Sequence, residues 1–221
     1  RSVHTREKRQ KEKITHNVSV LCIFCKARAD SDLQHKLHYC PKFAPRGRII
    51  ELKTVVDTDR IVRNLENIKK TVNRKVLFMV KANAYGHGIA DVAKATQNVV
   101  DAFGVATVEE AKKLRDVGIT RDILVLTVLP DEIIETYALE AILSLHCESQ
   151  LSALLYLARI GFIEPCQMRL HLKVDSGMHR FGFEKDKLDE VCFLLKDYGF
   201  TVEGVFSHLR DGTSAQKALF D

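Results

Sequence analysis

The feature that most constrains the fold is a regular alternation of two kinds of segment from residue 58 to the end of the chain. Short apolar runs alternate with longer segments whose apolar residues recur at helical spacing. The apolar runs are residues 76–80, 103–106, 123–129, 141–145, 168–174 and 202–207. Because strands joined by helices form parallel sheets, we expect a parallel sheet with buried, strand-like runs, the first one buried on both faces.

The segments between these runs carry helix signals. A helix is predicted over 58–72, where Ile61, Leu65 and Val72 fall on one face. Thr107, followed three residues later by Glu110, is typical of a capping box at a helix start, and Gly118 is typical of a helix end. Further helices are predicted over 89–97, after Pro130, over 149–160 and over 185–198.

Six successive strand and helix units favour a (β/α)8 barrel of the TIM type over a doubly wound sheet. No glycine-rich dinucleotide motif follows the first run, which also argues against the doubly wound alternative. A sixth helix begins near residue 214, and two further units are absent. The sequence therefore predicts an α/β fold that is an incomplete barrel, with about six βα units.

Residues 1–48 differ in composition and are predicted to be a separate leader. Residues 1–50 hold 12 Lys and Arg against 4 Asp and Glu, whereas the remainder holds 22 against 25. A disordered, solvated tail is the commoner form of such a segment, and a nucleic-acid-binding arm is the alternative. No apolar run approaches the ~18 residues of a membrane span, so we expect a cytoplasmic protein without a membrane or nucleic-acid partner.

The cysteines fall into two groups. Those of the leader form a C-x-x-C pair followed by histidines and a third cysteine, and a zinc site could use Cys22, Cys25, His38 and Cys40. One residue separates His38 from Cys40, which fits no common zinc-finger spacing, and a leader without metal is the competing interpretation. The others lie in apolar segments, where a thiol packs as a small hydrophobic group: Cys147, Cys166 and Cys192.

Polar and ionisable residues follow the apolar runs at their carboxyl ends, where barrel enzymes carry their active sites. Lys81 follows the first run, and His146 follows the fourth. The other residues of this kind are Thr127, Lys173, Asp175, Arg180, Ser207 and His208. We expect these side chains to gather around one rim.

Lys81 leaves an apolar run and enters the stretch VKANAYGHG. Burial disfavours the charged form of an amine, and a neutral lysine forms Schiff bases with aldehydes such as pyridoxal phosphate. Gly86 and Gly88 would let backbone N–H groups approach an anion, and Tyr85 could donate its hydroxyl to the same anion. The competing interpretation is a lysine that simply reaches solvent.

The stretch VKANAYGHG resembles the pyridoxal-phosphate signature of alanine racemases. A second block, HLKVDSGMHRFG (171–182), is similar to the family segment KVDTGMGRLG, and a third, EGVFSHLRDGTS (203–214), resembles GxxTHFAxAD. The blocks occur in family order and extend over the chain from about residue 49. Residues 49–221 are thereby identified as a partial pyridoxal-phosphate-binding barrel, in which His179 stands where a glycine is common.

The resemblance implies roles for two residues of the first block. Lys81 would carry the cofactor as a Schiff base and act as one of two catalytic bases. Tyr85 would contact the cofactor phosphate. The second base of the family is a tyrosine of a C-terminal β domain, contributed by the other subunit of a homodimer, and this chain does not contain it.

The resemblance also implies roles in the second and third blocks. Arg180 would approach the phenolic oxygen of the cofactor ring. Lys173, which is carbamylated in some members, would help to hold that arginine, and His208 would lie near the ring in a hydrogen-bond network. From the residues themselves, Asp175 and Gly177 are expected to shape the turn that leaves the strand.

The activity that the resemblance implies is an isomerase reaction, the interconversion of L- and D-alanine by two bases, which supplies D-alanine for peptidoglycan. Three alternatives remain open. They are a related serine racemase, an amino-acid decarboxylase of the same barrel type with a shorter V-K-A-N motif, and a barrel that binds pyridoxal phosphate without turnover.

Overall fold

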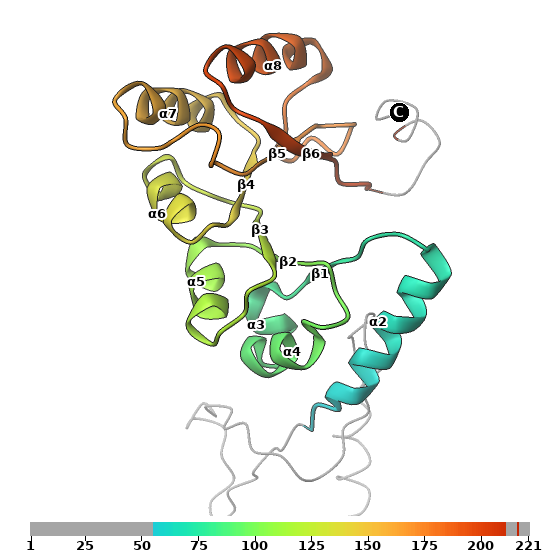
Figure 1. The fold of residues 1–221 in the computed structure, drawn as a ribbon. Helices are drawn as coiled ribbons and strands as arrows, with labels where there is room; N and C mark the ends of the chain where they lie inside the picture. The colour runs from blue at the N-terminus through green and yellow to red at the C-terminus, as the bar shows by residue number, and fades with distance from the viewer. Residues whose placement is uncertain (1–54, 211–215, 217–221) are drawn as a thin grey trace, which may run out of the picture. The chain divides into compact units, whose positions relative to one another are not determined.

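The computed structural model describes residues 55–210 and Gln216 (Figure 1). The chain divides into two compact units, residues 1–72 and 73–221. In the first unit, α2 (Thr58–Val72) has the predicted bounds, and it begins after Asp57, whose carboxylate accepts the backbone N–H of Arg60 (3.0 Å). The leader and its four candidate zinc ligands lie outside the described residues.

The second unit is built on a parallel sheet of six strands, each paired with the next along the chain. The strands are β1 (Leu77–Met79), β2 (Ala102–Val105), β3 (Asp122–Val125), β4 (Ile142–Leu145), β5 (Leu170–Lys173) and β6 (Val202–Phe206). A doubly wound sheet would place later strands on both sides of the first. The sequential order instead confirms the predicted barrel type, with six of its eight strands present in the described residues.

Helices follow the strands as predicted, and Figure 1 shows α5, α6 and α7 along one face of the sheet. They are α3 (Lys81–Tyr85), α4 (Ile89–Thr96), α5 (Val108–Asp116), α6 (Ile133–Ala138), α7 (Glu148–Arg159) and α8 (Leu188–Asp197). Short 3-10 turns precede two of them, η2 (Pro130–Glu132) and η3 (Lys185–Lys187). The helical spacing of apolar residues therefore located each of the longer helices.

The core lies between the sheet and these helices. Phe103 and Ile123 pair across β2 and β3, Leu143 and Leu170 pair across β4 and β5, and all four side chains are fully buried. Burial of a side chain of this size stabilises a fold by roughly 1.5–3 kcal/mol. This packing fixes the strands, and therefore the positions of the residues that follow them.

Three expectations about the strands and the cysteines are wrong. Leu77 in β1 is 36% exposed, because β1 is an edge strand of the described sheet and pairs only with β2. The third strand ends at Val125, short of the predicted residue 129. Cys166 and Cys192 are exposed, since one lies in a loop and the other on the solvent side of α8.

Candidate active site

Four basic residues meet at the carboxyl edge of the sheet. Lys81 comes directly after the buried Val80 that follows β1, and Lys173 is the last residue of β5. Arg180 lies in the loop after β5, and His208 follows β6. Partial burial and the positive charges of Arg180, Lys173 and Lys81 all lower the pKa of His208. The structure therefore brings together four residues that lie up to 127 positions apart in the sequence.

The backbone after Lys81 forms a left-handed turn. Ala82, Asn83, Ala84 and Tyr85 have φ between 52° and 55°, and Ala82 and Ala84 have ψ of 50° and 47°. The left-handed conformation costs a residue other than glycine roughly 1–2 kcal/mol. Such strain is concentrated at functional sites, where surrounding contacts hold it. No residue type in this turn except Asn83 signals it, and the sequence predicted only a loop.

The turn uses its own amide groups. The N–H of Gly86 donates to the carbonyl oxygens of Ala82 (3.0 Å) and Asn83 (3.1 Å), and the N–H of Gly88 donates to that of Asn83 (3.0 Å). The Asn83 side chain accepts the N–H of Ile89 (2.9 Å) at the start of α4. The N–H groups of Gly86 and Gly88 themselves are therefore bonded within the turn rather than open to an anion. The glycines instead supply the positive φ that closes the turn.

Glu110 is a site residue that the sequence missed. Half of the predicted capping box is present, because the Thr107 hydroxyl accepts the N–H of Glu110 (3.3 Å). The Glu110 carboxylate, however, does not return to Thr107. Its Oε1 accepts the N–H of Ala82 (2.6 Å), and its Oε2 accepts the N–H of Ala106 (2.8 Å). The capping-box motif predicted a carboxylate at the start of α5, but it did not indicate that this carboxylate would bind Ala82, 28 residues earlier.

Lys173 is buried, and its amine holds the main chain of the loop after β5. Its Nζ donates to the carbonyl oxygens of Arg180 (2.6 Å) and Phe181 (2.5 Å). Burial, followed by the charge of Arg180, lowers the pKa of this amine, while Asp175 opposes the shift. Lys173 therefore positions the Arg180 backbone, and its burial makes the amine easier to deprotonate than that of an exposed lysine.

Asp175 lies within the turn of the same loop. Its Oδ1 accepts the N–H groups of Gly177 (2.9 Å) and His179 (3.0 Å), and its Oδ2 lies 3.3 Å from Nδ1 of His179. His179 has φ of 55°, a conformation that glycine adopts without strain. The contacts with Asp175 explain how a histidine is held at a position where a glycine is common in the resembling segment.

The other predicted rim residues contact the same loops. Burial lowers the pKa of His146, whose Nδ1 lies 3.0 Å from the Ser144 carbonyl oxygen and whose ring centroid lies 4.8 Å from that of Phe181. The Ser207 hydroxyl lies 2.6 Å from that of Ser176. The backbone N–H of Thr127 donates to the carbonyl oxygen of Ala106 (2.9 Å). These contacts make His146 and Ser207 supports of the rim.

Comparison with known proteins gives the family of this chain. Residues 56–220 match the family model described as alanine racemase, N-terminal domain. The chain belongs to the alanine racemase family. The chain is 34% identical over 175 residues to the alanine racemase of Streptococcus equi subsp. zooepidemicus, covering 75% of this chain and 45% of that protein. It is 39% identical over 174 residues to that of Lactobacillus acidophilus, covering 75% and 45%.

Solved structures agree with the family assignment. The alanine racemase of Corynebacterium glutamicum superposes with a TM-score of 0.68 at 31% identity, covering 75% of this chain and 48% of that one. The alanine racemase of Bacillus anthracis with bound L-Ala-P gives a TM-score of 0.66 at 29% identity, covering 75% and 45%. The chain therefore spans about half the length of the alanine racemases that it matches.

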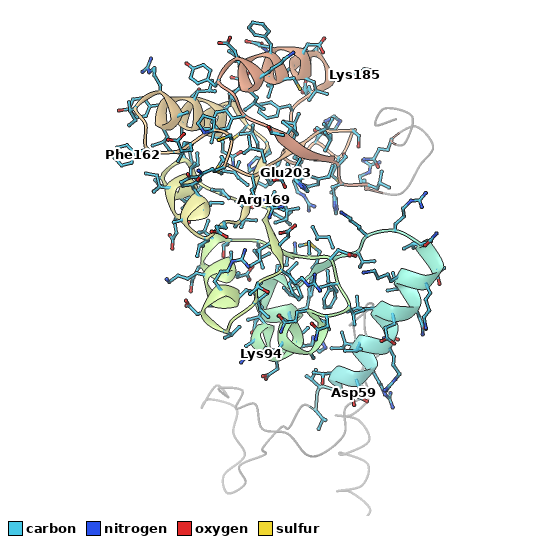
Figure 2. All side chains as sticks on the ribbon, viewed as in Figure 1. Asp59, Lys94, Phe162, Arg169, Lys185 and Glu203 are labelled. Carbon is cyan, nitrogen blue, oxygen red and sulfur yellow. The ribbon has the colours of Figure 1, made fainter. Side chains whose placement is uncertain are left out.

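The opposite edge of the sheet carries a second polar cluster. Arg169 pairs with Asp122 (2.6 Å) and Glu203 (2.8 Å), and Figure 2 shows Arg169 beside Glu203. Arg115 donates to the carbonyl oxygens of Ile119, Arg121, Leu139 and Glu140. Both arginines line a cavity of about 500 Å³. Because their donors are satisfied and they lie at the amino ends of the strands, they stabilise the fold.

Metal ligands are not grouped in the part of the chain that the structure describes, where no three His, Cys, Asp or Glu side chains lie together. Within the same residues, no helix is both long and apolar enough to cross a membrane.

Proposed function

We propose that this chain provides the cofactor-binding part of an enzyme that interconverts L- and D-alanine with pyridoxal 5'-phosphate. The observation that carries the proposal is the meeting of Lys81, Lys173, Arg180 and His208 at the carboxyl edge of a barrel sheet of this family. The names of the relatives support alanine as the substrate.

The donor set fits the cofactor. Pyridoxal phosphate carries an aldehyde that condenses with a lysine amine, together with an anionic phosphate and a phenolic oxygen. Three cationic side chains around a histidine suit such an anion. Two carboxylates of the described residues lie near them, and both are occupied: Asp175 by backbone N–H groups and His179, and Glu110 by the N–H groups of Ala82 and Ala106. When bound, the cofactor supplies an electron sink that stabilises negative charge on the α-carbon of an amino acid.

The residues of this chain then have distinct roles. The Lys81 Nζ would hold the cofactor covalently and, once released, accept the α-proton on its own face of the substrate. Arg180 would face the phenolic oxygen, while Lys173 holds the Arg180 backbone. Tyr85, whose side chain is 46% exposed, can donate its hydroxyl to the phosphate. His208, with its lowered pKa, would offer a neutral imidazole near the ring.

Racemisation also requires a base on the opposite face of the substrate. We propose that a tyrosine from a second subunit provides it in a cytoplasmic homodimer, as the family resemblance implies, and that the D-alanine formed is used for peptidoglycan. A carbamate on Lys173 would place a negative charge close to Arg180. The neutral amine that this modification requires is favoured by burial of Lys173.

The test is α-proton exchange. The full natural polypeptide, loaded with pyridoxal phosphate, should convert L-alanine to D-alanine in deuterium oxide and place deuterium on the α-carbon. The variant Lys81→Arg keeps the positive charge but forms no Schiff base, and it should lose both activities. Release of carbon dioxide would indicate a decarboxylase, and a higher kcat/KM for serine would indicate a serine racemase. Cofactor binding without exchange of the α-proton would indicate a barrel that has no catalytic role.

A further inference from the structure

Glu110 occupies a position between the segments that follow two neighbouring strands. Ala82 is the first residue after Lys81, and Ala106 is the first residue after β2. The Glu110 carboxylate accepts the backbone N–H groups of both, one with each oxygen (2.6 and 2.8 Å). One side chain from the first turn of α5 therefore joins the Lys81 turn to the next unit of the sheet.

The ladder hydrogen bonds of β1 end just before the Lys81 turn. β1 has only three residues and lies at an edge of the described sheet, so it pairs with β2 alone. The N–H of Val80 donates to the carbonyl oxygen of Gly104 (2.8 Å), which is the last ladder bond before the turn. Beyond it, the N–H of Ala84 donates to the Val80 carbonyl oxygen, those of Gly86, His87 and Gly88 donate to carbonyl oxygens within the turn, and that of Ala82 donates to Glu110.

The turn also begins with a strained residue. Ala82 has φ of 52° and ψ of 50°, a conformation that alanine rarely adopts. Its N–H is occupied by a charged acceptor, and hydrogen bonds to charged acceptors are stronger than those between neutral groups. The carboxylate thus stabilises the left-handed conformation at the residue next to Lys81.

We propose that Glu110 is a positioning residue for Lys81, whose carboxylate fixes the left-handed turn and thereby the direction in which the amine leaves the sheet. The role in positioning the amine for a cofactor rests on the proposed function. The role in holding the turn does not, because it depends only on contacts within this chain.

The test compares two neighbouring glutamates in the full natural polypeptide. Glu110→Gln keeps the size of the side chain, but its NH2 group cannot accept a hydrogen bond, so one of the two backbone N–H groups loses its partner. Glu109→Gln is the matched control, because Glu109 is exposed and pairs only with Lys113 (2.7 Å). Glu110→Asp keeps the charge but is too short to join both segments.

The first readout is hydrogen exchange without cofactor. Glu110→Gln should raise the exchange rate of the amides of residues 82–88 by about tenfold or more, while α7 and α8 keep wild-type rates. Glu109→Gln should match wild type throughout. Unchanged exchange at residues 82–88 would overturn the proposal. Faster exchange across the whole unit would also overturn it, because it would show a general loss of stability.

The second readout is covalent labelling of Lys81 by pyridoxal phosphate and borohydride. Glu110→Gln and Glu110→Asp should each need about tenfold more cofactor for half-labelling than wild type, at equal folded fraction, and Glu109→Gln should not. Equal half-labelling in all variants would overturn the positioning role. Absence of labelling at Lys81 in wild type would refute the proposed function, while hydrogen exchange would still decide whether Glu110 holds the turn.

Discussion

Gly182 offers a sharp test of how the loop that carries Arg180 is packed. Its φ is +120°, and a Cβ placed there would lie 2.6 Å from the backbone nitrogen of Asp175 and 2.8 Å from the carbonyl carbon of Val174. These backbone atoms cannot move aside cheaply, because the Asp175 N–H donates to the Phe183 carbonyl oxygen (2.9 Å) and the Phe183 N–H donates to that of Lys173 (2.9 Å). Gly182→Ala should therefore displace the loop rather than be absorbed by it.

The magnitude follows from two contributions. Overpacking costs typically 1–3 kcal/mol, and a residue other than glycine held at an unfavourable positive φ costs a further 1–3 kcal/mol. We expect Gly182→Ala to lower the free energy of unfolding by roughly 2–6 kcal/mol. The control is Gly161→Ala, since Gly161 has φ of +75° and nothing within 4 Å of its Cβ position. That substitution should cost only about 1 kcal/mol.

Urea denaturation of the two variants and wild type measures these values. Because Lys173 bonds to the Arg180 and Phe181 carbonyl oxygens, Gly182→Ala should also weaken pyridoxal phosphate binding, measured by absorbance titration. If the two variants lost the same free energy of unfolding within about 0.5 kcal/mol, the reasoning about the close approach to Asp175 would be refuted.

Three further predictions concern ionisable groups. Burial lowers the pKa of His146 and His171 below the ordinary value of 6.5. Below pH 6.5 the unfolded chain therefore binds more protons than the folded one, and the free energy of unfolding should fall as the pH drops. A free energy of unfolding, measured with urea, that stays constant below pH 6.5 would contradict this. Arg169 lowers the pKa of Asp122 below 3.8. The difference in free energy of unfolding between wild type and Asp122→Asn should therefore persist above pH 3.8 and vanish as acid protonates the carboxylate. A difference that stays constant with pH would disprove the pairing. Bicarbonate should add a carbamate to Lys173, seen by carbon-13 NMR, and a signal that survives Lys173→Arg would assign it elsewhere.

The sequence predicted the fold well because the fold depends on periodic burial. The helix over 58–72 and the six strands follow from apolar spacing that any core of this type requires. Polar residues after the strands were also predictable as a group, because parallel strands bring their carboxyl ends to one edge. Lys81, Lys173, Arg180 and His208 are brought together for that reason.

Other features depend on contacts that have no local signal. The left-handed turn at Ala82–Tyr85 contains residue types that usually avoid this conformation, and distant partners such as Glu110 help to hold it. The N–H groups of Gly86 and Gly88 are bonded within the turn, a pattern that the sequence did not indicate. Cys166 and Cys192 were expected to pack as small hydrophobic groups, yet both are exposed. Each difference arises because tertiary contacts overrode a local pattern.

The most direct test of the central claim is the site at which pyridoxal phosphate becomes attached. The full natural polypeptide would be treated with the cofactor, reduced with borohydride and digested for peptide mass mapping. We predict a single pyridoxyl group on Lys81, at the start of the left-handed turn, and no labelling of that peptide in Lys81→Arg. Attachment to Lys173 or to a surface lysine, with Lys81 unmodified, would contradict the account.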